Sequence, residues 1–207
     1  MIIAIDGPAA AGKGTLARRL AAHFGLPFVD TGLLYRATGR LVLDAGADPA
    51  DPIAAARAAR ALTPSDMERC DLRGPEADRA ASLVASIPAV RAALLDFQRG
   101  FARPPGAVLD GRDIGTVIFP NADVKLYVTA SAYARGRRRW LELQARGVTA
   151  DIETVTAEIR ARDAADAARS AAPLIAASDA TTIDTTDMDA EATLVVALSL
   201  IASKLPA

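Results

Sequence analysis

A glycine-rich loop with one lysine lies near the N-terminus and is the stretch best suited to chemistry. An apolar run, Met1–Ile5, leads into Asp6–Thr15, and apolar residues then recur at helical spacing over residues 16–24. A strand, a glycine-bounded loop and a helix in this order are typical of a phosphate-binding P-loop. Gly7 and Gly12 permit a tight turn that points N–H groups at phosphate oxygens, and the helix N-terminus faces the same anion.

Lys13 adds a full positive charge that can follow the β- and γ-phosphates of a nucleotide into the transition state. Gly14 stands where the general pattern GxxxxGK[ST] has a hydroxyl ligand for Mg²⁺, and Thr15 follows it. We therefore expect no direct metal ligand from the protein, and we expect Thr15 to meet phosphate or a metal-bound water. An ordinary glycine-rich turn is the alternative, which a lysine at this spacing disfavours. The loop predicted to bind ATP comprises Gly7, Pro8, Ala9, Ala10, Ala11, Gly12, Lys13, Gly14 and Thr15.

An acid ends the apolar strand predicted near Val108–Leu109. Asp110 follows this strand directly, which is the usual layout for an aspartate that orients Mg²⁺ and its waters in P-loop enzymes. We therefore expect a phosphate-bound Mg²⁺ with water-mediated contact to Asp110 or Thr15. Arg112 and Asp113 come next, in a loop beyond the edge of the sheet.

Two predicted helices in the C-terminal half carry arginines at helical spacing. Arg135, Arg138 and Arg139 share one side, with no acid on that helix until Glu142. Such a cluster can close over transferring phosphates, although most arginine runs are solvated helix faces. In the next helix, predicted to run through Arg169, the residues Arg162, Asp166 and Arg169 share a face. This second group is either a surface ion-pair ladder or a set that binds sugar and phosphate, and spacing leaves both open.

Strands and helices alternate along the chain. Five short strands are predicted, at Ile2–Ile5, Phe28–Val29, Val108–Leu109, Lys125–Val128 and Thr182–Ile183. With the P-loop first, this order predicts an α/β fold with a doubly wound five-stranded parallel sheet. The second strand tip carries Thr31 and then a helix from Leu33 with Tyr35 and Arg36. These residues can bind a ligand at the carboxyl edge of the sheet, or they are a core aromatic and a solvated charge.

Composition limits the possible classes of protein. The 207 residues carry 24 basic and 25 acidic side chains, so charge offers no general case for nucleic acid or an anionic membrane. One cysteine, Cys70, excludes an internal disulfide and indicates a reducing compartment. We see no signal peptide and no apolar stretch of about 20 residues, so we expect a soluble, cytoplasmic protein. We also expect a monomer, because no exposed apolar stripe stands out.

A small phosphotransferase is the class that these features favour. A switch GTPase would need an Asn/Thr-Lys-x-Asp motif, which the sequence lacks, and a motor or assembly ATPase is usually longer. A nonenzymatic regulator that binds ATP is the alternative from another class. It would show no turnover that depends on an acceptor.

Several motifs, in order, resemble those of bacterial cytidylate kinases, which belong to the nucleoside monophosphate (NMP) kinases of the P-loop type. They are residues 7–15 (GPAAAGKGT), 30–36 (DTGLLYR), 110–120 (DGRDIGTVIFP) and 162–174 (RDxxDxxRxxAPL), with Ala81-Ser82, Arg91 and Gln98-Arg99 between them. The resemblance covers nearly the whole chain, and the GRDIGT and RDxxDxxR blocks indicate the branch that acts on CMP.

The resemblance implies transfer of the ATP γ-phosphoryl group to CMP or dCMP. It also implies a single P-loop kinase domain, 1–207, with an NMP-binding insert at about 38–100 and a short lid at about 135–152. By position, Ser82 and Asp113 would recognise cytosine, with Arg112 nearby. Thr31 and Asp166 would hold the sugar, and Tyr35 would line the acceptor pocket. The base and acceptor phosphate would be surrounded by Arg36, Arg91, Arg162 and Arg169. The transferring phosphoryl group would be stabilised by Lys13, Arg135, Arg138, Arg139 and Arg162.

The insert departs from the family pattern. Many members carry a small three-stranded sheet there, whereas residues 48–73 of this chain are short, rich in proline and alanine, and poor in strand signals. We expect a reduced, mainly helical insert, which leaves the preference among CMP, dCMP and UMP open. A kinase for another small acceptor, of the UMP, AMP or shikimate type, is the nearer alternative.

Overall fold

The chain forms two compact units in this computed structural model, which describes residues 1–204. The first unit comprises Met1–Val29 and the chain from Pro104 onward, and the second comprises Asp30–Arg103. The predicted insert, residues 38–100, lies within the second unit, which extends beyond it at both ends.

The five predicted strands are confirmed, each slightly longer than expected. They are β1 (Ile2–Asp6), β2 (Phe28–Asp30), β3 (Ala107–Gly111), β4 (Val124–Thr129) and β5 (Thr181–Asp184). The order across the sheet is β2-β3-β1-β4-β5, and the strands run parallel. In register, Ile5 pairs with Asp110 and Asp6 pairs with Tyr127. The P-loop strand β1 therefore lies in the middle, between the strand that ends near Asp110 and β4.

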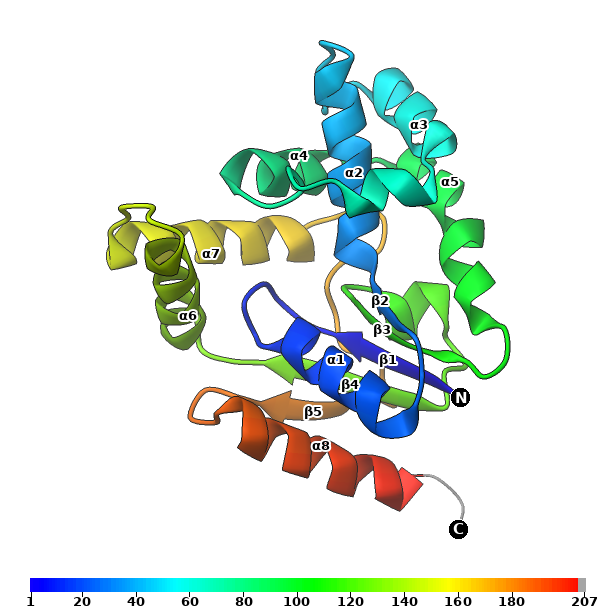
Figure 1. Cartoon of the computed structure of the whole chain (residues 1–207), viewed down its shortest axis with the longest axis vertical. Coiled ribbons are helices and arrows are strands. Elements are labelled where there is room, and N and C mark those ends of the chain that lie inside the picture. Colours follow the sequence, from blue (N-terminus) through cyan, green and yellow to red (C-terminus); the bar gives the residue numbers. More distant parts are fainter. Residues whose placement is uncertain (205–207) are drawn as a thin grey trace. The chain divides into compact units, whose positions relative to one another are not determined.

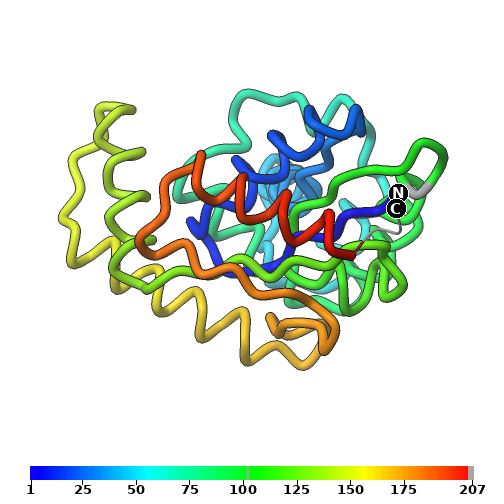
Figure 2. Tube along the Cα trace, turned by 90° about the horizontal axis from the view of Figure 1, so that it is seen from below, coloured from blue at the N-terminus to red at the C-terminus, as the bar shows by residue number. Residues whose placement is uncertain are grey.

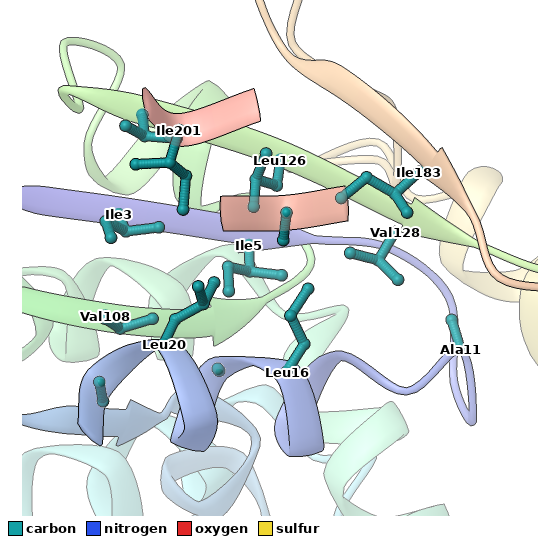
Figure 3. Packing of buried hydrophobic residues seen from close by; sticks show 14 residues of the cluster. Ile3, Ile5, Ala11, Leu16, Leu20, Val108, Leu126, Val128, Ile183 and Ile201 are labelled. Carbon is teal, nitrogen blue, oxygen red and sulfur yellow. The ribbon is translucent and has the colours of Figure 1, made fainter. Parts of the chain in front are cut away.

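Helices of the first unit cover the sheet because aliphatic side chains alternate along its strands. The helices are α1 (Lys13–Phe24), α6 (Ala132–Ala145), α7 (Ile152–Ala167) and α8 (Ala190–Lys204). Ile3 and Ile5 of β1 pack with Leu16 and Leu20 of α1 and with Ile201 of α8 in one buried cluster (Figure 3). Helix α8 also contacts α1 and β5 (Figure 2). This core fixes the start of α1, and hence the P-loop, on the sheet.

The opposite face of the sheet carries Ala4, Asp6 and Lys125. A short π-helical turn, η3 (Ile114–Ile118), contacts β1 and β3 on this face. A Cβ built on Gly115 of this turn would lie 3.1 Å from Cδ of Lys125 and 3.3 Å from Oδ2 of Asp6. The sequence predicted a loop here, so the π turn is a feature that only the structure shows.

The second unit is helical, as expected, apart from Asp30 at the end of β2 (Figure 1). It comprises α2 (Thr31–Asp44), α3 (Pro52–Ala61), η1 (Pro64–Glu68), α4 (Pro75–Ala85), α5 (Pro88–Arg99) and η2 (Gly100–Ala102). Proline opens α3, α4 and α5, where its missing N–H costs no intrahelical bond. Helices α2 and α4 cross closely, since a Cβ on Gly39 would lie 2.8 Å from Cβ of Ala80. Alanines therefore let short helices pack tightly around Leu34, Val84 and Leu94.

Two predicted helix ends are wrong. Helix α2 begins at Thr31 and not at Leu33, so Thr31 belongs to the helix rather than to a break before it. Helix α7 ends at Ala167, so Arg169 lies beyond it. There the carbonyl of Asp166 accepts a bond from the N–H of Leu174 at 3.0 Å, which turns the chain away.

Within residues 1–204, no single helix has both the length and the apolarity to cross a bilayer. Helices α4 and α5 reach that length and apolarity only when taken together, and the chain bends by 98° between them.

Candidate functional site

The loop between β1 and α1 adopts a backbone that its glycines make possible. Gly7 has a φ of 146°, and a Cβ there would lie 2.0 Å from the carbonyl oxygen of Val128. Gly12 ends the loop with a φ of 92°, and Ala10 has a φ of 58°, which is uncommon for a residue with a side chain. The loop is thus held in a tight conformation ahead of the N-terminus of α1, the arrangement that receives phosphate.

Lys13 is buried beneath this loop. Its Nζ donates to the carbonyl of Pro8 at 2.8 Å and lies 3.8 Å from Oδ1 of Asp110. Burial, followed by the charge of Arg112, lowers the pKa of Lys13 to about 8. The ammonium group therefore has little solvent around it and gains from any phosphate bound in the loop.

Asp110 lies close to the start of α1. A Cβ on Gly14 would be only 3.1 Å from Oδ2 of Asp110, so glycine at this position lets the carboxylate approach the helix. Among residues 1–204, no group of three or more His, Cys, Asp or Glu side chains could hold a metal ion. One carboxylate beside a P-loop fits a Mg²⁺ that is bound mainly by phosphate and water.

The three arginines predicted for the lid do not form one cluster. Arg135 is 5 % exposed, and its guanidinium donates two hydrogen bonds to Asp163 of α7, at 3.0 and 2.6 Å. It also bonds to the P-loop carbonyl of Ala9 at 3.3 Å. Arg138 turns elsewhere and donates to Oγ1 of Thr185 at 3.0 Å, whereas Arg139 donates to Glu142 at 3.3 Å. The neutralising acid Asp163 comes from another helix, so spacing along one helix could not reveal it.

A cavity of about 250 Å³ lies beside the P-loop in the first unit. Its walls include the end of the loop, Thr15, Arg138, Glu142 and the segment after β5. Thr185, 2 % exposed, ties these walls together because its hydroxyl donates to the carbonyl of Ala11 at 3.0 Å while accepting from Arg138. This cavity can take a flat organic group attached to the phosphates of the loop.

Asp166 forms a buried ion-pair group rather than a surface ladder. It is 1 % exposed, accepts from Nε of Arg112 at 3.0 Å, and forms an ion pair with Arg169. Arg162 lies one turn earlier on α7 and is half-buried. The partner Arg112 follows β3, far away in sequence, so the structure joins the two motifs that carried the family resemblance.

Asp6 is a buried acid that the sequence analysis gave no role. It is 4 % exposed, and its two carboxylate oxygens accept from the N–H groups of Ile114 and Gly115, each at 2.7 Å. Burial raises the pKa of Asp6 to about 6 in spite of these bonds. The signal was available, because Asp6 ends an apolar strand just as Asp110 does.

The second unit holds the remaining predicted acceptor residues. The guanidinium of Arg91 lies over the ring of Tyr35, 5.4 Å from its centroid, and donates to the carbonyl of Ala85 at 3.2 Å. Nε of Arg36 donates to Asp78 at 3.0 Å, one turn before Ser82 on α4. Thr31, the first residue of α2, is buried. Arg91 of α5 thus meets Tyr35 of α2, and Arg36 of α2 meets Asp78 of α4.

Comparison with known proteins identifies close relatives. Residues 3–203 match the family model described as cytidylate kinase. A curated cytidylate kinase from Granulibacter bethesdensis is 63 % identical over 100 % of this chain and 99 % of its own length. Another, from Acidiphilium cryptum, is 62 % identical over 97 % of this chain and 95 % of its own length.

Solved structures share the fold at lower identity. An uncharacterised protein from Eubacterium ventriosum has a TM-score of 0.57 at 15 % identity, covering 98 % of this chain and 99 % of its own. The Thermus thermophilus protein TT1252 has a TM-score of 0.51 at 21 % identity, covering 100 % of this chain and 98 % of its own.

Proposed function

The chain belongs to the cytidylate kinase family, and we propose that it transfers the γ-phosphoryl group of ATP to CMP or dCMP, forming ADP and CDP or dCDP. The observation that carries this proposal is the match of residues 3–203 to the family model in a chain whose P-loop is formed around a buried lysine.

The donor nucleotide is assigned to the first unit. The P-loop amides and Lys13 receive the β- and γ-phosphates, and the adjoining cavity of about 250 Å³ receives the adenine. Arg138, fixed by Thr185, forms part of the wall of that cavity. Lys13, which lies 3.8 Å from Oδ1 of Asp110, gains phosphate as a further anionic partner, and its charge is already in place when the γ-phosphoryl group moves.

The chemistry requires no nucleophilic side chain. An oxygen of the CMP phosphate is already an anion and attacks the γ-phosphorus in line with the departing ADP oxygen. The barrier lies in bringing two polyanions together, which fixed positive charges reduce. Lys13 and the arginines Arg135, Arg138, Arg139 and Arg162 are proposed for this task. Arg135 acts from the position where Asp163 and Ala9 hold it.

Mg²⁺ fits this site as a phosphate-bound ion. Asp110 and the Thr15 hydroxyl would hold its waters, since Gly14 provides no ligand of its own. When bound, the metal neutralises charge on the β- and γ-phosphates. Asp110 also lies 3.8 Å from Lys13, so the chain itself keeps the lysine directed toward the loop.

For the acceptor nucleotide we propose the residues at the family's motif positions. Asp113, Arg112 and Ser82 are proposed for cytosine, and Asp166 and Thr31 for the sugar. Arg36, Arg91, Arg162 and Arg169 are proposed for the base and acceptor phosphate, and Tyr35 for the pocket wall. The buried Arg112–Asp166 pair supports this proposal because it holds two of these groups in fixed orientation.

Initial rates of ADP release test the reaction. ATP with Mg²⁺ is supplied with CMP, dCMP, UMP, AMP or shikimate as the acceptor. Turnover with CMP and dCMP alone is expected. Equal rates with UMP would show that the helical second unit does not select cytosine, and absence of turnover with every acceptor would contradict the proposed reaction.

We also propose that the protein acts as a monomer in the cytoplasm, without nucleic acid or membrane. A net charge of −1 supports this, because it offers no strong attraction to polyanions. Light scattering coupled to size-exclusion chromatography measures the mass directly, and a multiple of 21.5 kDa would contradict the monomer.

A further inference from the structure

The buried carboxylate of Asp6 has no part in the transfer described above. It stands at the end of β1, directly before Gly7, so its backbone is continuous with the P-loop. Its side chain lies on the face of the sheet opposite to Ile3 and Ile5, where η3 also lies. Both of its oxygens are used there, one on the N–H of Ile114 and one on the N–H of Gly115.

These two N–H groups immediately follow Asp113, the residue proposed to read cytosine. Asp113 is 4 % exposed, and its own carbonyl accepts from the N–H groups of Val117 and Ile118, at 2.9 and 3.2 Å. The peptide on the C-terminal side of Asp113 is therefore held from one direction by Asp6 and from the other by the π turn. Its φ of −144° and ψ of 26° belong to no regular element, and these bonds hold the backbone from which its side chain extends.

We propose that Asp6 is a positioning residue that fixes the Asp113 loop to the P-loop strand and so sets the affinity for the acceptor base. The inference rests on the proposed role of Asp113. A carboxylate suits this position because it offers acceptors only, whereas an amide would direct its NH₂ group at one of the two N–H donors. An unpaired N–H in this dry location would make the loop move.

The closest substitution is Asp6→Asn, which keeps the size and removes one acceptor. We expect the KM for CMP to rise about tenfold, the effect of losing one hydrogen bond to a charged group, with a much smaller change in the KM for ATP. Asp123→Asn is the matched control. Asp123 accepts a hydrogen bond from the N–H of Ile2 at 2.6 Å. This bond also joins a carboxylate to a backbone N–H, but at the other end of β1. The control is expected to leave both KM values unchanged.

A double-mutant cycle with Asp113→Ala separates positioning from general loosening of the fold. If Asp6 acts through Asp113, Asp6→Asn adds little to the KM for CMP once Asp113 is alanine. Additive effects would overturn the inference. If Asp113→Ala alone leaves the KM for CMP unchanged, the assigned role of Asp113 fails. If it raises that KM while Asp6→Asn does not, only the present inference fails.

Gly115→Ala provides a second variant if Asp6→Asn does not fold. Its Cβ would stand 3.3 Å from Oδ2 of Asp6 and 3.1 Å from Cδ of Lys125, so it displaces the bond but keeps the carboxylate. We expect a severalfold rise in the KM for CMP with the KM for ATP nearly constant. An unchanged KM for CMP in a folded Gly115→Ala protein would contradict the inference.

Discussion

Arg135 and Asp163 form a nearly buried ion pair that joins α6 to α7 in the first unit. The arginine side chain is 6 % exposed, its partner is 27 % exposed, and their two hydrogen bonds measure 3.0 and 2.6 Å. The same guanidinium reaches the P-loop at Ala9. An arginine predicted to close over transferring phosphates is thus held in the scaffold around the loop.

Removal of Asp163 should therefore affect folding as well as activity. We expect Asp163→Ala to lower the free energy of unfolding by about 3 kcal/mol, because it leaves Arg135 buried without its carboxylate. Glu142→Gln is the control, since the exposed Arg139–Glu142 contact at 3.3 Å should contribute less than about 1 kcal/mol. Urea unfolding of the three proteins measures both values. Equal losses in the two variants would show that burial of the Arg135 pair is unimportant.

Lys13 should be required for turnover but not for folding. We expect Lys13→Met to reduce kcat by about 10²- to 10³-fold, the usual cost of losing a fixed charge on the reacting group. The unfolding temperature should not fall, because burial lowers the pKa of Lys13 to about 8, a sign that burying its charge opposes folding. Lys204→Met, which changes an exposed side chain at the end of α8, should retain full kcat. A substantial kcat in Lys13→Met would remove the lysine from the mechanism.

Asp6 should make stability depend on pH in a defined window. Its pKa is about 6 in the folded protein against 3.8 as the reference, so the folded state binds more protons between these values. Stability from this group is therefore present at low pH and lost as pH rises from about 4 to about 6, by up to about 3 kcal/mol. Lys13, Asp113 and Tyr127 are the charged or titratable groups that act on it.

The difference in unfolding free energy between the parent protein and Asp6→Asn isolates this effect, because the other acids are common to both. That difference should decline between pH 4 and pH 6 and then level off. Parallel pH profiles for the two proteins would show that Asp6 titrates normally.

Gly39 should be essential to the packing of the second unit. A Cβ there would lie 2.8 Å from Cβ of Ala80 and 3.0 Å from its carbonyl carbon, which is backbone and cannot rotate away. We expect Gly39→Ala to destabilise the protein by about 1–2 kcal/mol, despite the better helix propensity of alanine. Gly100→Ala, with no atom within 4 Å of its Cβ, should be nearly neutral. Thermal unfolding compares the two, and a stabilised Gly39→Ala protein would contradict the close crossing of α2 and α4.

Local sequence determined the regular elements and the nature of the chemistry. The five strands, the helical second unit and the P-loop all follow from short-range signals: apolar runs, proline at helix starts, and glycines beside Lys13. These signals work because they act within a few residues, where chain geometry leaves few options. The errors at Thr31 and Arg169 lie at helix ends, and at the second of them a bond from Leu174 to the carbonyl of Asp166 turns the chain out of the helix.

Tertiary structure decided which charges are neutralised. Asp163 pairs with Arg135 across two helices, and Asp166 pairs with Arg112 across 54 positions of sequence. Asp6 meets Ile114 and Gly115 only because β1 and β3 are neighbours in the sheet. Spacing along one element cannot report such contacts, since burial and partner choice depend on how separate elements pack.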